Sequence, residues 1–372
     1  MDAVVPIPLA TVTILYNHKN ITIQLDDYFI SLRYTDHLNG ESDELELVVA
    51  DPDGRWLNDW YPGKGDTLHA QINYKGQSLD CGSLEIDEAN PSGDNPLTMT
   101  IKALATGVNS PLRTKQNRAH ESTTLSAIAA YYARLHNLQL VGQIANIPID
   151  RATQHHESDL RFLKRIGAEH GYLFSVKHGQ LIFSDLSKIR SLKPTMTIQR
   201  SDVSNWSFTD KIRGIYKGVD LQSHDALKRQ TQHASHTATA ASYQHSTSSD
   251  TLRKHRRSHS QTAAQIKSQA ALDKENMEKT TGNMTFSDGN TALKSGIAAT
   301  LSGWGVLSGV YQFQTLNHNV ARSGAYAVDG DVQRIDQLPV LSRHQQGAKT
   351  TTAQTAAKAN VVQPVTGDVN HA

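Results

Sequence analysis

Residues 68–86 read LHAQINYKGQSLDCGSLEI, which places two short strands, 68–74 and 79–86, on either side of the turn residues Lys75 and Gly76. Further strand-like segments recur at regular spacing through the first hundred residues, separated by turns such as Asp53-Gly54. Short strands with such turns are typical of a β-sandwich or barrel, so the sequence predicts an all-β first domain. The expected strands are 12–16, 21–25, 29–34, 45–49, 68–74, 79–86 and 97–103.

From about residue 119 the apolar residues fall at helical spacing. A first amphipathic helix is expected behind the capping candidates at 122–124. Its apolar face comprises Leu125, Ile128, Ala129, Tyr132 and Leu135. A second helix is expected from 157–159 to Gly171, a residue suited to a left-handed helix end. Its buried face comprises Phe162, Leu163 and Ile166.

A tight hairpin follows the second helix, with strands 172–176 and 181–183 around a turn at 177–180. The two helices and this hairpin predict a small α+β unit. Strand signals then resume at 206–208 and 214–219.

Residues 222–260 are rich in Ser, Thr, His, Gln and Ala and hold few large apolar side chains. Such a segment cannot bury enough apolar surface to offset the entropy lost on ordering, so we expect a mobile insertion loop. The basic run 253–257 has no interleaved aromatic residues for base stacking, which argues against nucleic-acid binding. An alanine-rich helix at 260–279 and a closing strand set follow, and the tail after residue 341 is expected to be disordered. The closing strands are 297–301, 309–317 and 326–335, with a turn at 303–305.

The single cysteine, Cys81, cannot form a disulfide within the chain, which fits folding in a reducing cytoplasm. The N-terminal residues MDAVV lack the basic region and long apolar run of a secretory signal. The sequence also contains no stretch that approaches the roughly 18 apolar residues of a membrane span. We therefore expect a protein that starts in the cytoplasm and has no membrane partner.

A net charge of +1 hides an asymmetry. Residues 1–110 hold 6 Lys+Arg against 17 Asp+Glu, a net charge of −11, and the remainder holds 31 against 19, a net charge of +12. A nucleic-acid backbone would repel the acidic first third, so no sequence-specific nucleic-acid partner is expected. Opposite signs suit subunits that meet head to side, and they equally suit two independent solvated surfaces.

Motifs for phosphate binding and acyl transfer are missing from the sequence. Gly63-Lys64-Gly65 lacks the spacing of a phosphate-binding loop and is interpreted as a turn. The segment GVLSG at 305–309 places its serine one residue too late for a nucleophile elbow. Residues 51–54 (DPDG) open like a calcium loop but lack the later oxygen ligands, so they too are interpreted as a turn.

Histidines are numerous, at 18, but their spacing does not converge on a metal. His155 and His156 are neighbours, so their side chains point to different faces of any regular element, unlike an i, i+4 pair. Histidines in the polar segment 222–260 favour adventitious metal affinity over a preformed site. Paired carboxylates lie beside turns or strand ends, where solvation is the default, so we expect no catalytic residues, no cofactor and no metal site. These pairs are Asp26-Asp27, Asp43-Glu44 and Asp87-Glu88.

The order of these elements along the chain resembles that of a known protein family. A strand domain is followed by the helix TTLSAIA at 123–129, the helix ESDLRFLKRI at 157–166, and a glycine with a hairpin at 171–183. Near the end, LNHNV at 316–320 leads into Ser323-Gly324. Over about residues 5–340, and most specifically over the two helices and the hairpin, the chain resembles the phage late control protein D family.

Members of that family are hub proteins of contractile phage tails, similar in architecture to the hubs of larger contractile phages and to the base of type VI secretion spikes. The resemblance implies a mainly β (α+β) fold with two barrel-like domains in a trimeric, pseudo-sixfold ring. Such a homotrimer would match the hexameric tail tube or its initiator protein on one side and the central spike protein on the other. Tape measure and baseplate wedge proteins are further expected partners, in the tail baseplate of a virion assembled in the host cytoplasm.

The residue patterns and the family resemblance together predict how the chain divides into domains. The expected parts are an N-terminal β-barrel-like domain at 1–110, a helix-helix-hairpin domain at 111–195, a second β-barrel-like domain at 196–341 with the mobile insertion at about 222–260, and a disordered tail at 342–372.

We expect a structural protein and not an enzyme. One alternative is a tail-delivered cell-wall-degrading or wall-binding protein, which would require a glutamate or zinc constellation in a cleft. The other is a type VI-like secretion spike component, which neighbouring genes would distinguish from a phage hub.

Overall fold

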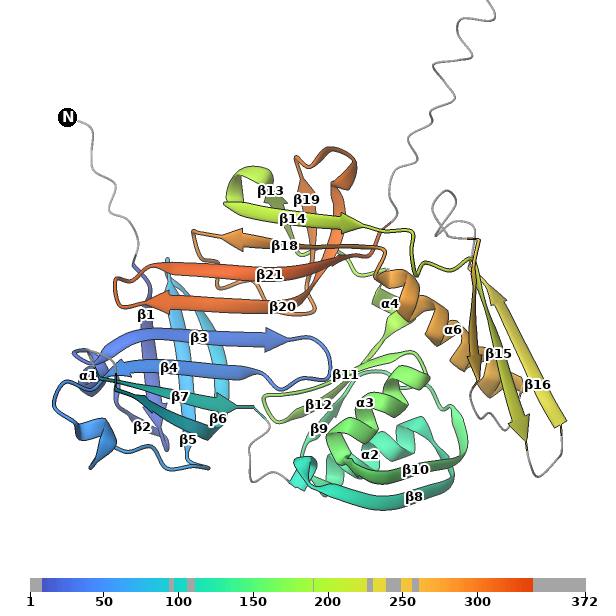
Figure 1. Ribbon diagram of the computed structural model, residues 1–372, viewed down its shortest axis with the longest axis horizontal. Helices are drawn as coiled ribbons and strands as arrows, with labels where there is room; N and C mark the ends of the chain where they lie inside the picture. Colours follow the sequence, from blue (N-terminus) through green and yellow to red (C-terminus); the bar gives the residue numbers. More distant parts are fainter. Residues whose placement is uncertain are drawn as a thin grey trace, which may run out of the picture. The chain divides into compact units, whose positions relative to one another are not determined.

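β-strands dominate the computed structural model, with 51% of the described residues in strands and 20% in helices, so the fold is mainly β as predicted. Figure 1 shows how the elements follow one another. The structure describes residues 9–336 except 94–96, 106–110, 190, 226–229, 239–248 and 256–260. The tail at 342–372, for which the sequence predicts disorder, lies outside the described residues.

The first β module is an antiparallel sheet whose side chains alternate between core and solvent. Every second residue of β5 is buried, from Leu68 to Tyr74, because successive side chains of a strand point to opposite faces. The strands pair in the order β3-β4-β7-β6-β5-β1. They are β1 (Thr11–Tyr16), β2 (Lys19–Asn20), β3 (Phe29–His37), β4 (Glu44–Ala50), β5 (Thr67–Tyr74), β6 (Gln77–Ser92) and β7 (Thr98–Leu104).

The strand expected at 21–25 is wrong. Asn17 and His18 form the predicted turn with positive φ angles of 45° and 67°, but the returning strand β2 has only two residues. Thr22–Leu25 then forms one helical turn, α1. Hydrogen bonds connect the beginning of this turn to β1. The amide of Ile21 donates to the Ile14 carbonyl at 3.0 Å, and the Ile14 amide donates to Thr22 Oγ1 at 2.9 Å. These bonds cover the outer edge of β1 at Ile14.

The helix-helix-hairpin unit forms as predicted. Each helix is capped by the hydroxyl before it: Thr124 Oγ1 accepts from the Ala127 amide at 3.2 Å, and Ser158 Oγ accepts from the Arg161 amide at 3.3 Å. The first helix begins at Leu125, because the preceding residues form a strand ribbon that the sequence did not predict. The elements are β8 (Lys115–Thr124), α2 (Leu125–Leu135), β9 (Gln139–Val141), β10 (Pro148–Ser158), α3 (Asp159–Glu169), β11 (Tyr172–Lys177), β12 (Gln180–Asp185) and α4 (Leu186–Ile189).

The second β module continues the same sheet. Its strands pair in the order β14-β18-β21-β20, and β19 joins β20 to β13. β13 and β18 were not predicted; β18 reads TTGNMTF, with polar residues at most positions. The strands are β13 (Met196–Gln199), β14 (Asn205–Asp210), β18 (Thr280–Phe286), β19 (Ala298–Ser302), β20 (Gly309–Ala321) and β21 (Tyr326–Arg334). Short 3-10 turns are η1 (Arg55–Leu57), η2 (Pro111–Arg113), η3 (Arg200–Asp202) and η4 (Gly305–Leu307).

Most of the described residues of 222–260 lie in strands and not in the expected loop. They form a three-stranded sheet, ordered β16-β15-β17, that packs on the predicted alanine-rich helix. A few apolar residues suffice for this, because Val219 and Leu252 pack on Leu272 of the helix. Residues 226–229, 239–248 and 256–260 of the segment lie outside the described residues. The elements are β15 (Gly218–Asp225), β16 (Gln230–Thr237), β17 (Thr251–His255) and α6 (Gln261–Met277).

Strands β3 and β20 join the two β modules. They pair antiparallel from Thr315 opposite His37 to Ala321 opposite Ser31, which makes one 13-stranded sheet. Figure 1 shows the two strands side by side at the middle of this sheet. One apolar core, containing Leu47 of the first module and Phe313 of the second, runs beneath both modules.

Candidate functional site

A buried ion pair lies where the hairpin meets the joined β modules. Lys177, the last residue of β11, donates from Nζ to Asp36 of β3 and to Ser295 Oγ, the latter at 2.7 Å. Its Nζ also lies 3.3 Å from Asp43 Oδ1. The Ser295 amide donates to Asp36 Oδ2 at 2.7 Å. We call Asp36, Asp43, Lys177 and Ser295 the junction cluster.

The pKa values of the two carboxyl groups in the junction cluster are shifted in opposite directions. Burial alone would raise the pKa of Asp36, but the charge of Lys177 and the hydrogen bonds from Lys177 and Ser295 outweigh it and lower the pKa. Burial and the charge of Asp36 raise the pKa of Asp43, against the opposing effect of Lys177. The sequence predicts that Asp43 is solvated, and this prediction is wrong. The exposed fraction of Asp43 is 2%, because the turn before β4 packs this residue against the hairpin.

The segment LNHNV at 316–320 forms the seam between the β modules. Thr35 Oγ1 donates to Asn317 Oδ1 at 2.9 Å, and Arg33 Nε donates to Asn319 Oδ1 at 2.8 Å. Between them His318 is fully buried, with its Nδ1 2.7 Å from the Tyr326 hydroxyl. Burial lowers the pKa of His318 to about 4, so this imidazole is neutral at physiological pH. The amide side chains of the segment therefore hold two modules together.

A second buried carboxylate organises the helix-helix-hairpin unit. Asp159, the first residue of α3, is 1% exposed and accepts two bonds from Arg118 Nη1, at 2.8 and 2.9 Å. His136 Nε2 lies 2.8 Å from Asp159 Oδ2, and Gln154 Nε2 donates to Oδ1 at 2.6 Å. Gln154 also accepts from the hydroxyl of Tyr132, whose pKa burial raises to about 12. The Asp159 side chain thus ties α3 to β8, β10 and the end of α2.

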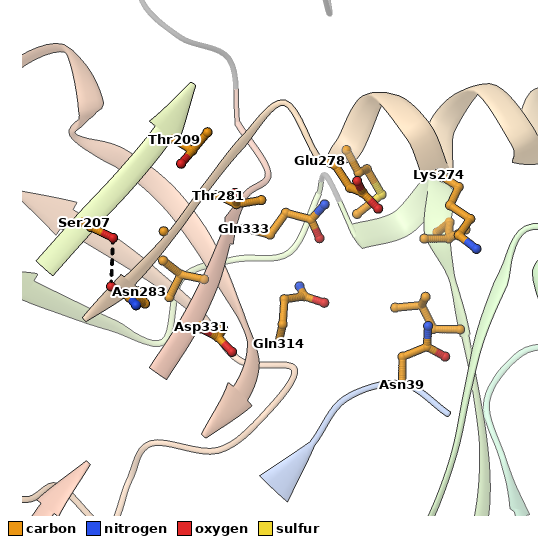
Figure 2. Close-up of a pocket in the computed structure, with 15 residues that line it drawn as sticks. Asn39, Ser207, Thr209, Lys274, Glu278, Thr281, Asn283, Gln314, Asp331 and Gln333 are labelled. Atoms are coloured by element: carbon orange, nitrogen blue, oxygen red, sulfur yellow. Dashed lines mark hydrogen bonds between the residues drawn. The ribbon is translucent and has the colours of Figure 1, made fainter. Parts of the chain in front are cut away.

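A polar cleft of about 510 Å³ lies between the second β module, the end of α6 and the loop after β3 (Figure 2). Its floor is one face of the sheet, where side chains of paired residues stand in rows across the strands. One row runs through Ser207, Asn283 and Asp331, and Ser207 donates to Asn283 Oδ1 at 3.0 Å. A second row runs through Thr209, Thr281 and Gln333. The polar side chains of the wall are Asn39, Lys274, Glu278 and Gln314.

The cleft is equipped for hydrogen bonding. Amide and hydroxyl groups line most of it, and burial together with the charge of Asp329 raises the pKa of Asp331. Glu278 Oε2 accepts from Lys211 Nζ at 3.2 Å. Across the described residues, no three His, Cys, Asp or Glu side chains gather in a way that could hold a metal ion.

The residues considered from sequence do not gather at this cleft. The turn at 51–54 is held by Asp51 Oδ1, which accepts from the Trp56 amide at 3.1 Å. Gly63 lies in a turn, where its amide donates to the Tyr16 hydroxyl at 3.0 Å. Ser308 Oγ accepts from the Trp304 amide at 3.0 Å. His155 and His156 lie near the irregular end of β10. No local sequence motif indicates the cleft, because the residues of its floor come from three strands that are far apart in sequence.

The basic run 253–257 falls partly on β17, which contains Arg253 and Lys254. Lys254 Nζ lies 3.4 Å from Glu275 Oε1 of α6. Residues 256–257 lie outside the described residues. None of the helices in the described part of the chain combines the length and apolar character needed to cross a membrane.

Solved structures define the class of protein to which this fold corresponds. The 43 kDa tail protein of prophage MuSo2 from Shewanella oneidensis aligns with a TM-score of 0.64 and 14% identity over 88% of this chain and 99% of that chain. A tail protein from Neisseria meningitidis MC58 aligns with a TM-score of 0.63 and 11% identity over 87% and 96%. A type VI secretion system component from E. coli aligns with a TM-score of 0.55 and 10% identity over 84% and 76%. The chain has the fold of phage tail and type VI secretion proteins.

Relatives by sequence are more specific. The chain is 30% identical over 213 residues to the probable baseplate hub protein of Escherichia phage P2, covering 55% of this chain and 54% of that protein. It is 29% identical over 210 residues to the probable baseplate hub protein of Escherichia phage 186, covering 55% and 53%. The chain spans about half the length of these curated relatives, and no protein-family model matches it. The resemblance to phage tail hub proteins is thereby confirmed.

Proposed function

We propose that this chain is a structural hub subunit of a contractile phage tail baseplate. As a homotrimer it joins the hexameric tail tube to the trimeric central spike, so it acts as a symmetry adaptor and not as an enzyme. The observation that carries the proposal is the β3–β20 pairing, which makes two β modules parts of one sheet. A continuous sheet locked by the junction cluster is suited to passing mechanical load between a tube and a spike.

The similarity to baseplate hub proteins of phages P2 and 186 supports the same role. The proposed partners are the spike protein and the tube or tube-initiator protein, with tape measure and wedge proteins as further neighbours. The proposed location is the virion tail baseplate, reached after assembly in the host cytoplasm, without membrane or sequence-specific nucleic-acid contacts. The division at 1–110, 111–195, 196–341 and 342–372 is part of the proposal.

The decisive experiment is native mass spectrometry of the full chain, alone and with the spike protein encoded beside it. We expect three copies per particle, and a complex of this trimer with a trimeric spike. A stable monomer that binds neither the spike nor a tube protein would overturn the proposal.

The similarity to a type VI secretion component favours a second candidate, a secretion spike component outside a virion. Tail-tube and tape-measure genes beside the coding gene favour the phage hub, and type VI genes favour the alternative.

The carboxyl groups of Glu278 and Asp331 line one cleft, so wall-degrading activity deserves a direct assay. Peptidoglycan turnover by the purified trimer, abolished in Asp331→Asn, would replace the hub proposal with an enzymatic one. We expect no turnover.

A further inference from the structure

Two carboxyl groups meet at the amine of Lys177. This lysine ends β11 of the hairpin, whereas Asp36 lies in β3 and Asp43 lies in the turn before β4. Lys177 Nζ donates to Asp36 Oδ1 and lies 3.3 Å from Asp43 Oδ1. One amine thus contacts two carboxyl groups, and its single positive charge can balance only one of them.

Water is largely excluded from these three groups. The side chains of Asp36, Asp43 and Lys177 are 8%, 3% and 14% exposed. A buried ion pair loses the hydration of both charges, so a neutral product of the same atoms is favoured there more than in water. Holding an amine against a carboxyl group also removes the entropy cost of bringing the two together, which promotes bonds that free reactants do not form in water.

The second carboxyl group supplies an acid. Burial and the charge of Asp36 raise the pKa of Asp43, against the opposing effect of Lys177. The buried Tyr34 hydroxyl donates to Asp43 Oδ2 at 3.3 Å and holds the carboxyl group in place. A carboxyl group that keeps its proton beside a nucleophile can pass protons to and from the reacting atoms.

Ser295 donates to both carboxyl oxygens of Asp36. Its amide donates to Oδ2 at 2.7 Å, and its hydroxyl donates to Oδ1 at 2.7 Å. When a nitrogen attacks the carboxyl carbon, negative charge moves onto these oxygens, and donors fixed beside them stabilise that charge. The junction cluster therefore combines a nucleophile, a carboxyl carbon, an acid and two oxygen-binding donors.

We propose that Lys177 and Asp36 condense to an amide bond that links the hairpin covalently to β3, with Asp43 as the proton carrier. The Lys177 ammonium first gives one proton to Asp36, which leaves a neutral amine and a carboxylic acid. The nitrogen lone pair then attacks Cγ of Asp36, and the N–C bond forms. Asp43 takes a proton from the nitrogen and gives its own proton to the departing hydroxyl, so a C–O bond breaks and one water molecule leaves. Asp43 ends in the protonation state in which it began.

The cross-link joins two residues that lie 141 positions apart in the chain. An ion pair separates when the chain unfolds, whereas an amide bond does not, so the link would keep the hairpin attached under load. This bond goes beyond the proposed hub role, which stands with or without it.

Mass spectrometry of the denatured full chain tests the bond. We expect a mass one water molecule below that of the sequence. Because Asp-Gly pairs such as Asp53-Gly54 can also lose water, a tryptic digest must locate the change. Trypsin does not cleave after an acylated lysine, so residues 34–55 and 166–188 should appear as one branched peptide. Its fragments should place the link between Asp36 and Lys177.

Two variants and one internal pair serve as controls. Lys177→Arg keeps the cation but removes the amine nucleophile, and Asp43→Asn keeps the shape of the side chain but removes the acid. Both variants should show the full mass of their own sequences. The Lys75–Asp288 pair, with 2.5 Å between Nζ and Oδ2, is 47% and 66% exposed, so its two residues should appear in separate linear peptides.

A parent chain of full sequence mass that trypsin cleaves after Lys177 would overturn the inference and leave the hub role intact. A water loss that persists in Lys177→Arg would do the same, and so would a link to Asp43 in place of Asp36. Equal cross-linking in Asp43→Asn and the parent would remove the assigned proton carrier. If Asp43→Asn fails to fold, the parent digest and Lys177→Arg decide the question.

Discussion

Lys177 and Asp36 form an ion pair between the hairpin and the strand that joins the two β modules. Asp36 also accepts from the amide and the hydroxyl of Ser295, in the second β module. One carboxylate therefore contacts three parts of the chain that are far apart in sequence. A hub that carries load between two partners needs such parts to move as one body.

Replacing Lys177 with methionine should destabilise the protein by about 3–5 kcal/mol, because Asp36 and Asp43 would stay buried without their cation. Urea unfolding of the variant measures this loss. Lys188→Met is the matched control, since Lys188 is exposed and donates to the exposed Gln143 side chain, so this change should cost about 0.5 kcal/mol. A loss of similar size in both variants would mean that the junction cluster is not a special source of stability.

Local pattern was enough to predict much of the fold. The alternation of the first β module gave its strands, and apolar spacing behind hydroxyl caps gave α2 and α3. The sequence pattern failed to predict strands whose inward-facing side chains contact polar partners and not an apolar core. β8 and β10 are examples, because Arg118 and Gln154 face the buried carboxylate of Asp159 and not an apolar surface.

The junction and the cleft could not be predicted for a different reason. Thr35 bonds to Asn317, which lies 282 residues away, and no local signal reports a pairing over that distance. Asp36 has no sequence feature that separates it from the many other acidic residues of the first β module. Asp43 shows the resulting error, since a carboxylate beside a turn is usually solvated, and only the docking of the hairpin buries it.

Stability should fall as the pH is lowered from about 6.5 to about 4, because of His318. Burial lowers the folded-state pKa of this imidazole from 6.5 to about 4, so in this window the unfolded chain binds a proton that the folded chain does not. The contribution is complete above about pH 6.5 and is lost on approach to pH 4. His318→Gln removes it. Urea unfolding across this range should therefore show a shallower pH slope for the variant than for the parent, and equal slopes would contradict the assignment.

The cap of α3 predicts an order among three residues at one position. Ser158 Oγ accepts from the Arg161 amide, so Ser158→Ala should cost about 1 kcal/mol by leaving that donor without its cap. Ser158→Gly should cost only a few tenths of a kcal/mol, because glycine leaves the helix end open to water. Thermal unfolding of both variants tests the order. If glycine proves more damaging than alanine, backbone freedom and not the cap dominates at this position.

Removal of the Asp159 carboxylate should be the most damaging single change in the helix-helix-hairpin unit. Asp159→Ala leaves Arg118, His136 and Gln154 without their common acceptor, and breaking one side of a buried ion pair costs about 3–5 kcal/mol. Glu121→Gln breaks the exposed pair with Arg151, both 61% exposed, and should change stability by less than about 1 kcal/mol. Hydrogen exchange adds the location of the effect, since protection should fall first in α3 and β10, the elements that Asp159 holds together. Loss of protection spread evenly over the first β module would show that the carboxylate acts on the whole fold, against this prediction.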